Sequence, residues 1–531
     1  MSTFQGLEVA KKALFAQQSA LYTTGHNIAN VNTKGYSRQR VNFETTSPFP
    51  YPSRVQPQIP GQIGTGVQIG AVQRIRDKFL DMQFRAENSR LGYWETKQEA
   101  LSRMENLLNE PSESGLSSRF DLFWQALQDL ADHPENSGAR AVVAQRGLAV
   151  AETFNYLSLS LQEIQKDLKE QINYSIDDIN SLLRQINDIN QQIQKIEPHG
   201  FLANDLYDER DRLIDELSQY MNIKVHRRDS SDSALDIADG IVSIEVVQDN
   251  GMSFPEPIFL IDAENYPLAE AVKEIKIEPE KEYTPITSIT IDGQIDENGN
   301  SNLLSKILNS SGRLSALMES YGYQMNGEVI GDFPEVMAEL DKMAQVFARE
   351  FNNIHSQGIN LEPETDADGN LIPNGGEFFV IKEGGGSEIT AENITVRKEI
   401  LDNPDLIAAG DPANGRRNGD NALELANLFD KPIGEEQGDP NFGNASIRQY
   451  YISLIGQIGV WGQEAETMRN NTEILQMQID HSRMSVSAVS LDEEISNLVK
   501  FQHAYNAAAR NMTAIDEMID RIINHMGLVG R

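Results

Sequence analysis

The chain has 531 residues, enough for roughly three to four domains, and 39% of them are hydrophobic, which is sufficient for several apolar cores. With 80 acidic and 45 basic residues the formal charge is −35, and a surface this acidic repels nucleic acid and anionic lipid. Cysteine is absent, which excludes disulfides, cysteine-ligated zinc, iron–sulfur clusters and cysteine nucleophiles. We therefore expect neither nucleic acid nor a membrane as a partner, and no apolar run is long enough to span a bilayer.

A seven-residue repeat begins close to the N-terminus. It predicts a helix over residues 4–29 that buries a narrow seam against a partner helix. The same stretch lacks the basic start and continuous apolar run of a cleaved signal peptide, because Lys11 and Lys12 interrupt it. The repeat consists of Leu7, Leu14, Leu21 and Ile28.

An asparagine-rich segment follows this helix over residues 27–39. Asn27, Asn30 and Asn32 precede Gly35, and both residue types tolerate left-handed backbone. The pattern is typical of a capped helix end followed by a polar turn.

A second heptad pattern, rich in isoleucine, predicts a long internal helix over residues 172–196. This helix should end at residues 197–200, where Pro198 and Gly200 break helical geometry. Its second row contains Asn190, which resembles the buried amide that fixes the register of a coiled coil. The two rows are Ile172, Ile179, Ile186 and Ile193, and Ile176, Leu183 and Asn190.

The chain should then resume as a helix and form a helical hairpin in a bundle. We expect Asn204 to cap this helix, because asparagine is favoured at that position. Asp208, Arg212 and Glu216 are spaced four apart, which indicates an exposed face with ion pairs.

The composition changes after Lys224 and predicts a small β-rich insert over residues 226–302. Helical periodicity returns after residue 303 and again near Ser446. The insert thus interrupts a helical body, and we expect its deletion to be tolerated. Its alternating apolar runs, separated by Asn-Gly and Asp-Gly turns, lie at 241–246, 275–278 and 288–291.

The C-terminus repeats the pattern of the N-terminus. A seven-residue step over residues 488–526 predicts a long helix with its own exposed seam. Since neither terminal seam has a core beside it in sequence, each end requires a partner helix. The main row is Leu491, Leu498, Tyr505, Met512, Ile519 and Met526, and the offset row holds Ile495, Ala509 and Ile523.

The expected fold is mainly α with a β insert: terminal helices that form a coiled-coil inner layer, an elongated helical-bundle body and a small β-rich outer domain. The layout is nested, with the ends outside and the insert innermost in sequence. The expected segments are an N-terminal arm and linker (1–60), a first half of the body (61–225), the insert (226–302), a second half of the body (303–480) and a C-terminal arm (481–531).

Motifs of enzyme chemistry are absent from the sequence. No zinc-peptidase, phosphate-loop or nucleophile-elbow pattern occurs, so we expect no catalytic residue, cofactor or metal. Residues 61–66 contain glycines in the wrong order for a dinucleotide turn and indicate a bend. Residues 366–370 lack the third ligand and the distal glutamate of a calcium loop and indicate an exposed turn.

The two ends carry more specific motifs. Asn27-Ile28-Ala29-Asn30, with Thr33, Gly35 and Tyr36, resembles the Asn-x-Ala-Asn-x-x-Thr-x-Gly-Tyr motif of bacterial flagellar axial proteins, which form the rod, the hook and the hook–filament junction. The continuation Ser37-Arg38-Gln39 is similar to the junction proteins rather than to hook protein. Residues 491–510 resemble the matching C-terminal motif, and residues 204–214 and 312–317 are also similar to the junction proteins.

This resemblance implies a structural protein that adapts the flexible hook to the rigid filament. It implies terminal helices paired in the inner layer of a tube, with a ring of copies, hook protein and the second junction protein as partners. It also implies export through the flagellar type III apparatus without a cleaved signal, to an extracellular location. A cytoplasmic export chaperone is expected on the C-terminal helix, at Leu498, Tyr505, Met512 and Ile519.

Two other functions stay open at this point. The chain could be another axial protein of the hook or rod, although Ser37-Arg38-Gln39 and the long internal heptad pattern favour a junction protein. A secreted adhesin or enzyme that works through the β insert is the other alternative.

Overall fold

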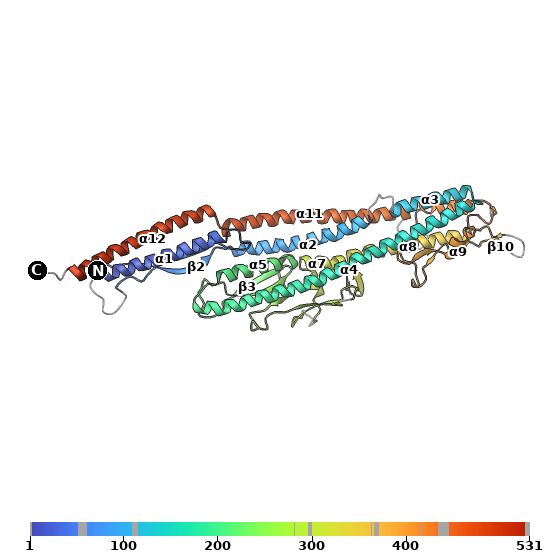
Figure 1. Cartoon of the computed structure of the whole chain (residues 1–531). Coiled ribbons are helices and arrows are strands. Elements are labelled where there is room, and N and C mark those ends of the chain that lie inside the picture. The colour runs from blue at the N-terminus through green and yellow to red at the C-terminus, as the bar shows by residue number, and fades with distance from the viewer. Residues whose placement is uncertain are drawn as a thin grey trace.

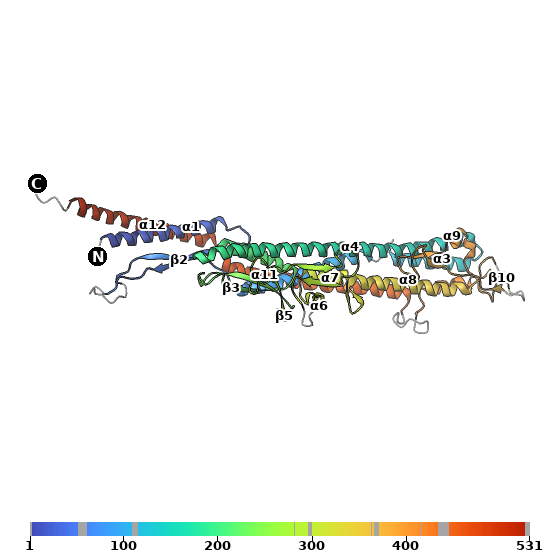
Figure 2. The same cartoon turned by 90° about the horizontal axis from the view of Figure 1, so that it is seen from below.

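The computed structural model describes residues 3–50, 61–108, 115–280, 282–295, 300–362, 364–365, 371–415, 417–433 and 445–525. The molecule is elongated, with both termini at one end and a helical body that extends away from them (Figures 1 and 2). The mainly helical fold with small β parts is confirmed. The predicted calcium-like turn at 366–370 and Met526 of the C-terminal row lie outside the described residues.

The two ends of the chain form an arm. The helix α1 (Thr3–Ala29) lies beside α12 (Leu491–Asp520), which is followed by the short π-helix η4 (Arg521–His525). An antiparallel hairpin of β1 (Gln39–Thr45) and β2 (Val67–Arg74) also packs on α1. The expectation that each terminal helix needs a partner is therefore confirmed, because each is the partner of the other.

The body is built around three long helices. The helices α2 (Lys78–Leu108) and α11 (Ile447–Ser487) pack side by side, and α4 (Ser137–Ile196) runs for 60 residues, about 90 Å at 1.5 Å per residue. The start of α4 lies 35 residues before the sequence pattern begins, at the cap Asn136, whose side chain accepts from the backbone of Gly138. Ser446 caps α11 through a reciprocal pair of bonds with Gln449.

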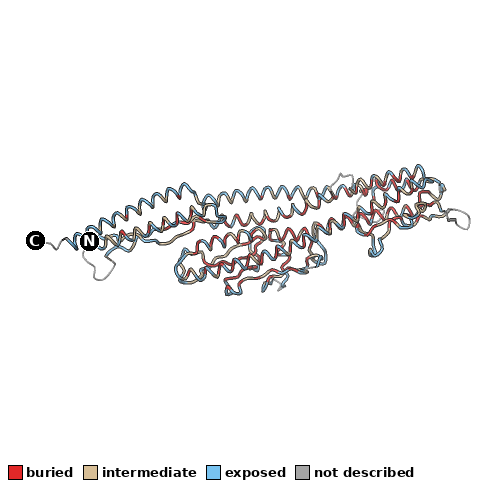
Figure 3. Tube along the Cα trace, viewed as in Figure 1, coloured by how far each residue is buried: buried red, intermediate tan, exposed pale blue. Residues whose placement is uncertain are grey.

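The end of the body far from the arm has an aromatic core. Its rings come from helices and strands distant in sequence, and the ring centres of Phe120 and Phe347 are 5.4 Å apart. The buried residues form a continuous line through the body, whereas the arm is mostly half-buried or exposed (Figure 3). The elements around this core are α3 (Leu116–Asp132), α8 (Asp332–Gln357), β12 (Phe379–Ile381), β13 (Ile394–Val396), α9 (Lys398–Asp402), η2 (Pro404–Leu406) and α10 (Asp420–Asn427), with β10 (Glu364–Thr365) and β11 (Leu371–Ile372) nearby in sequence.

The predicted β insert is present as small sheets packed along α4. One sheet has the order β3-β4-β5 and another pairs β6 with β7, all antiparallel. The predicted strands correspond to β4, β6 and β7, and β3 begins slightly before the expected boundary. The strands are β3 (Ile223–Arg228), β4 (Ile241–Val247), β5 (Ser253–Ile261), β6 (Ile275–Glu278) and β7 (Ser288–Ile291); α6 (Leu304–Leu308), α7 (Arg313–Tyr321), β8 (Tyr323–Met325) and β9 (Glu328–Ile330) follow.

The isoleucine rows of α4 are buried, but they do not form a coiled-coil seam. Asn190 donates to the carbonyl of Val242 in β4 at 2.9 Å, and Asn180 makes the same kind of bond to Ile275 in β6 at 3.0 Å. The buried amide therefore aligns strands along the helix, and the coiled-coil interpretation is wrong. Heptad spacing describes the buried face of a helix and cannot say whether a helix or a strand covers it.

Deleting residues 226–302 is expected to unfold or aggregate the body, because Ile172, Ile179 and Ile186 of α4 share one apolar core with these strands. Each isoleucine newly exposed to water costs about 1.5–3 kcal/mol. Because of this packing, we expect the insert to be needed for a folded body, contrary to the expectation from the sequence that it is dispensable. Circular dichroism and gel filtration of the purified deletion variant test this, and a folded, monomeric variant would restore the original expectation.

Candidate functional site

The contact between α1 and its neighbours is made by small side chains. Ala10, Ala16 and Ala20 are at most 6% exposed, whereas the predicted row of Leu7, Leu14, Leu21 and Ile28 is only half-buried. A side-chain carbon added at Gly6 would lie 3.3 Å from Cδ1 of Ile515 in α12, so the glycine leaves room for the isoleucine side chain. The leucine repeat thus borders the seam, and the alanines occupy its centre.

The main row of α12 faces α1 only in part. Leu498, Tyr505, Met512 and Ile519 are half-buried, but Leu491 is 44% exposed. The offset row is displaced by one residue from the prediction.

The displaced row contains the buried Glu494 and Ala508, while Ile495 and Ile523 are 53% and 66% exposed and Ala509 is half-buried. Steps of three and four residues alternate in a helical seam, so rows on either side of the main row fit the sequence equally well. The position of α1 selects the side, so Leu491, Ile495 and Ile523 do not pack against α1 within one chain, and the role of Leu491 and Ile495 in assembly stays a prediction.

The asparagine-rich segment at the end of α1 links α1 to the other elements of the arm. Asn27 is buried, and its amide donates to the carbonyl of Gln39 at 2.8 Å and to Glu494 of α12 at 3.1 Å. Its side-chain oxygen accepts from the Tyr36 hydroxyl at 2.8 Å and from the Gln39 backbone at 3.0 Å. A single amide thus ties α1, the turn, β1 and α12 together.

The other residues of the turn fix its backbone. Asn30 donates to the carbonyl of His26 at 3.0 Å, and Thr33 donates to the Asn30 side chain at 3.1 Å. Gly35 has φ +83°, and a side-chain carbon there would lie 3.3 Å from Cβ of Arg212, so both the conformation and the space favour glycine. Burial, together with the nearby carboxylates, raises the pKa of Tyr36, so its hydroxyl stays protonated as a donor.

An arginine directly after the turn joins the two ends of the chain. Arg38 contacts Glu494 at 2.8 Å and Glu493 at 2.6 Å, both in the first turn of α12. Its backbone N–H donates to the carbonyl of Ser487, the last residue of α11. Arg38 therefore binds both sides of the break between α11 and α12 and fixes the position of one helix relative to the other.

Arginines and aspartates form a buried ion cluster where the arm meets the body, which we call the joint cluster. Its centre is Asp211 of α5 (Asn204–Tyr220), whose side chain is 0% exposed and lies 2.7 Å from Arg74 and 3.1 Å from Arg85. The cluster joins β2, α2, α5, β3 and α11. Its members are Arg74, Arg76, Arg85, Arg227 and Arg483, with Asp81, Asp208, Asp211, Asp215 and Asp239.

Two expectations about α5 are wrong, one of them because of this cluster. Asp208 is buried, contacts Arg74 at 2.9 Å and accepts from the backbone of Ser37, so it does not belong to an exposed face. Arg212 does pair with Glu216 at 3.0 Å as predicted, but its other partner is Glu209. The cap of α5 is Ala203, while the Asn204 amide donates to the carbonyl of Val72.

Burial and charge act against one another in the joint cluster. Burial raises the pKa of Asp208. Burial also acts to raise the pKa values of Asp211 and Asp239, but the surrounding arginines overcome it, holding Asp211 well below its usual range and Asp239 at about 2. The low-pKa carboxylates are stable as anions only while the arginines surround them.

A loss of stability at low pH follows from Asp239. A folded-state pKa of about 2, against the usual 3.8, gives stability that is present above pH 3.8 and lost as the pH falls towards 2, at most about 2 kcal/mol. The unfolding free energy, measured with urea, should therefore fall less between pH 5 and pH 2.5 in the Asp239→Asn variant than in the unmodified protein. Asp292→Asn, at an exposed ion pair with Lys276, serves as the control, and an equally reduced fall in both variants would contradict the assignment.

Signs of metal chemistry or membrane insertion are missing from the part of the chain that the structure describes. No group of three or more metal-ligating side chains comes together there. No helix among these residues has the length and apolarity needed to cross a membrane. The described residues instead form long helical surfaces and an arm that is joined to the body by hydrogen bonds and ion pairs.

The chain is similar to flagellar proteins along its entire length. A family profile described as "Flagellar hook-associated protein FlgK helical domain" matches residues 101–371. Two profiles match the arm: "Flagella basal body rod protein" at residues 7–36 and "Flagellar basal body rod FlgEFG protein C-terminal" at residues 482–525.

Full-length relatives and a solved structure agree with these profiles. Flagellar hook-associated protein 1 of Bacillus subtilis is 43% identical over 534 residues, with 100% of each chain covered. The protein of the same name from Escherichia coli is 26% identical over 568 residues, covering 97% of this chain and 98% of the relative. The flagellar hook junction protein FlgK from Burkholderia pseudomallei has a similar fold, with a TM-score of 0.55 at 13% identity, over 76% of this chain and 100% of that one.

Proposed function

The chain belongs to the flagellar hook-associated protein 1 family of flagellar structural proteins, and from this premise we infer that it assembles at the hook–filament junction and adapts the flexible hook to the rigid filament. The observation that carries this role is the arm, in which the first and last helices of the chain pair and are braced against the body. A ring of such arms supplies a tube wall, and the acidic bodies lie around it. The protein acts by holding its neighbours in place and has no catalytic role.

Other flagellar hook and junction components are the partners of an assembled ring. One face of the ring contacts hook protein and the other contacts the second junction protein. The protein reaches this extracellular position through the flagellar type III apparatus without cleavage of a signal peptide. The long exposed helical surfaces of the arm and of α11 provide area for contacts between copies.

An export chaperone in the cytoplasm binds α12 before assembly, as an amphipathic helix in an apolar groove. Its contact row is Leu498, Tyr505, Met512 and Ile519. In the folded arm these side chains are half-buried against α1, so the chaperone takes the place of α1 on this row. Chaperone binding and arm pairing therefore exclude one another.

Electron microscopy of a strain that lacks the gene tests the proposed function, together with an assay of flagellin in the medium. We expect hooks without filaments, and flagellin released from the cells. Missing hooks would assign the protein to the rod or hook instead. Normal flagella would contradict a junction role.

A further inference from the structure

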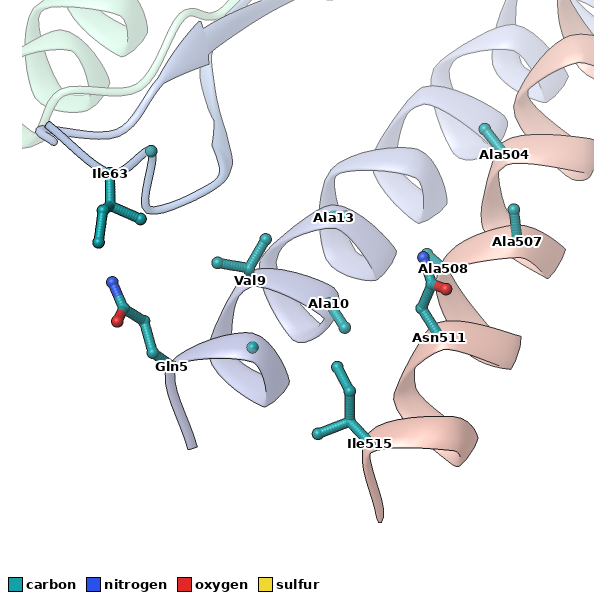
Figure 4. A pocket seen from close by; sticks show the side chains of 12 residues that line it. Gln5, Val9, Ala10, Ala13, Ile63, Ala504, Ala507, Ala508, Asn511 and Ile515 are labelled. Atoms are coloured by element: carbon teal, nitrogen blue, oxygen red, sulfur yellow. The ribbon is translucent and has the colours of Figure 1, made fainter. Parts of the chain in front are cut away.

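An open groove of about 600 Å³ lies on the arm, where α1, α12 and the segment at Ile63 and Gly64 meet. Small side chains, among them Ala10 and Ala507, line it together with Val9, Ile63 and Ile515 (Figure 4). None of the residues that line it is charged. In a chain of net charge −35, an uncharged concave surface of this size suits an apolar occupant.

The same arm exposes aromatic side chains on the opposite face of α1. Phe15 is 55% exposed and Tyr22 is 78% exposed. They are seven residues apart and so lie on one side of the helix, about 10.5 Å from each other at 1.5 Å per residue. The alanines that face α12 and the hairpin lie on the other side of the helix.

We propose that the aromatic face of α1 in one copy, led by Phe15, occupies this groove in the next copy of the chain. The proposal rests on the proposed function, because it requires many copies held side by side. Since the groove and the aromatic face lie on different sides of the arm, each copy carries both halves of the contact. A contact of this heterologous kind passes from copy to copy and closes into a ring or continues as a helix.

The expected size of the contact explains why it needs the assembly. Each buried aromatic side chain removes about 150–250 Å² from water, so Phe15 and Tyr22 together fall well below the roughly 1,200–2,000 Å² of a stable independent complex. The isolated chain therefore stays monomeric, and the groove fills only where other contacts also hold the copies together.

Cross-linking in assembled particles tests the contact. The natural chain has no cysteine, so every disulfide reports on introduced positions. Cells without their own gene would co-express Phe15→Cys and Ala507→Cys variants, and their purified hook–basal bodies would be oxidised. We expect a reducible dimer of twice 59.3 kDa, and at least tenfold less dimer when Phe15→Cys is paired with Ile452→Cys, an exposed position on α11.

Two further variants keep the test decisive if the Phe15→Cys and Ala507→Cys proteins do not assemble. Tyr22→Cys with Ala507→Cys reports on the same contact, and Ala507→Trp, which fills the groove, should lower the number of filaments at least tenfold relative to Ala507→Ser. Filament-bearing particles without either dimer would overturn the groove assignment and leave the junction role intact. Absence of the unmodified protein from hook–basal bodies would instead overturn the proposed function.

Discussion

Replacing Asp211 with alanine is expected to lower the free energy of unfolding by about 3–5 kcal/mol, because it leaves buried arginines without their shared carboxylate. Asp211 is 0% exposed and lies within 3.1 Å of both Arg74 and Arg85, with Arg227 at 3.6 Å. Its loss should also loosen the joint between arm and body. Urea denaturation of the purified variant measures the first effect, and limited proteolysis near the turn measures the second.

Glu216→Ala provides the matched control on the same helix. Glu216 is about half exposed and, among the residues that the structure describes, forms its ion pair with Arg212 alone, so its removal should cost less than about 1 kcal/mol. A cost for Asp211→Ala as small as that of Glu216→Ala would mean that the joint cluster does not stabilise the fold.

Leu498→Asp is expected to abolish filament formation while the body still folds. Leu498 is half-buried on the side of α12 that faces α1, and a carboxylate there must either lose water or separate the helices. The body keeps its own apolar core, so circular dichroism of the purified variant should retain most of its helical signal. Counting filaments on cells that carry only this variant measures the effect.

Ser496→Asp is the control for this experiment, since Ser496 is exposed on the same helix. It should give close to the normal number of filaments. Normal filaments with Leu498→Asp as well would show that the row at Leu498 is not needed for assembly.

The sequence was sufficient to predict the elements that depend on local pattern. The terminal helices, the break at Pro198 and Gly200, and the strands β4, β6 and β7 follow from periodicity and turn residues. The length of α4 could not be predicted, because its first half packs against aromatic side chains from distant segments and carries no simple repeat.

The parts of the arm that were mispredicted share one physical cause. Leucine repeats dominate a hydrophobic pattern, but closely packed helices prefer small side chains at their centre, so Ala10 and Ala20 carried a weaker signal than Leu14. The joint cluster was missed because its members are spread over some 400 residues, from Arg74 to Arg483. Opposite charges so far apart in sequence are common, and only the fold shows which of them meet.

The contacts of Arg38 bear on the order in which we expect the molecule to fold. Its contacts with Glu493 and Glu494 close a loop of more than 450 residues. Closing a loop of that length in an unfolded chain costs about 5 kcal/mol of entropy by the (3/2)RT ln n relation. A folded body removes most of this cost, because it already holds residue 487 at the end of α11 near residue 38. We therefore expect the arm to form after the body, and we expect a chain that is still incomplete at its C-terminus to lack the paired arm.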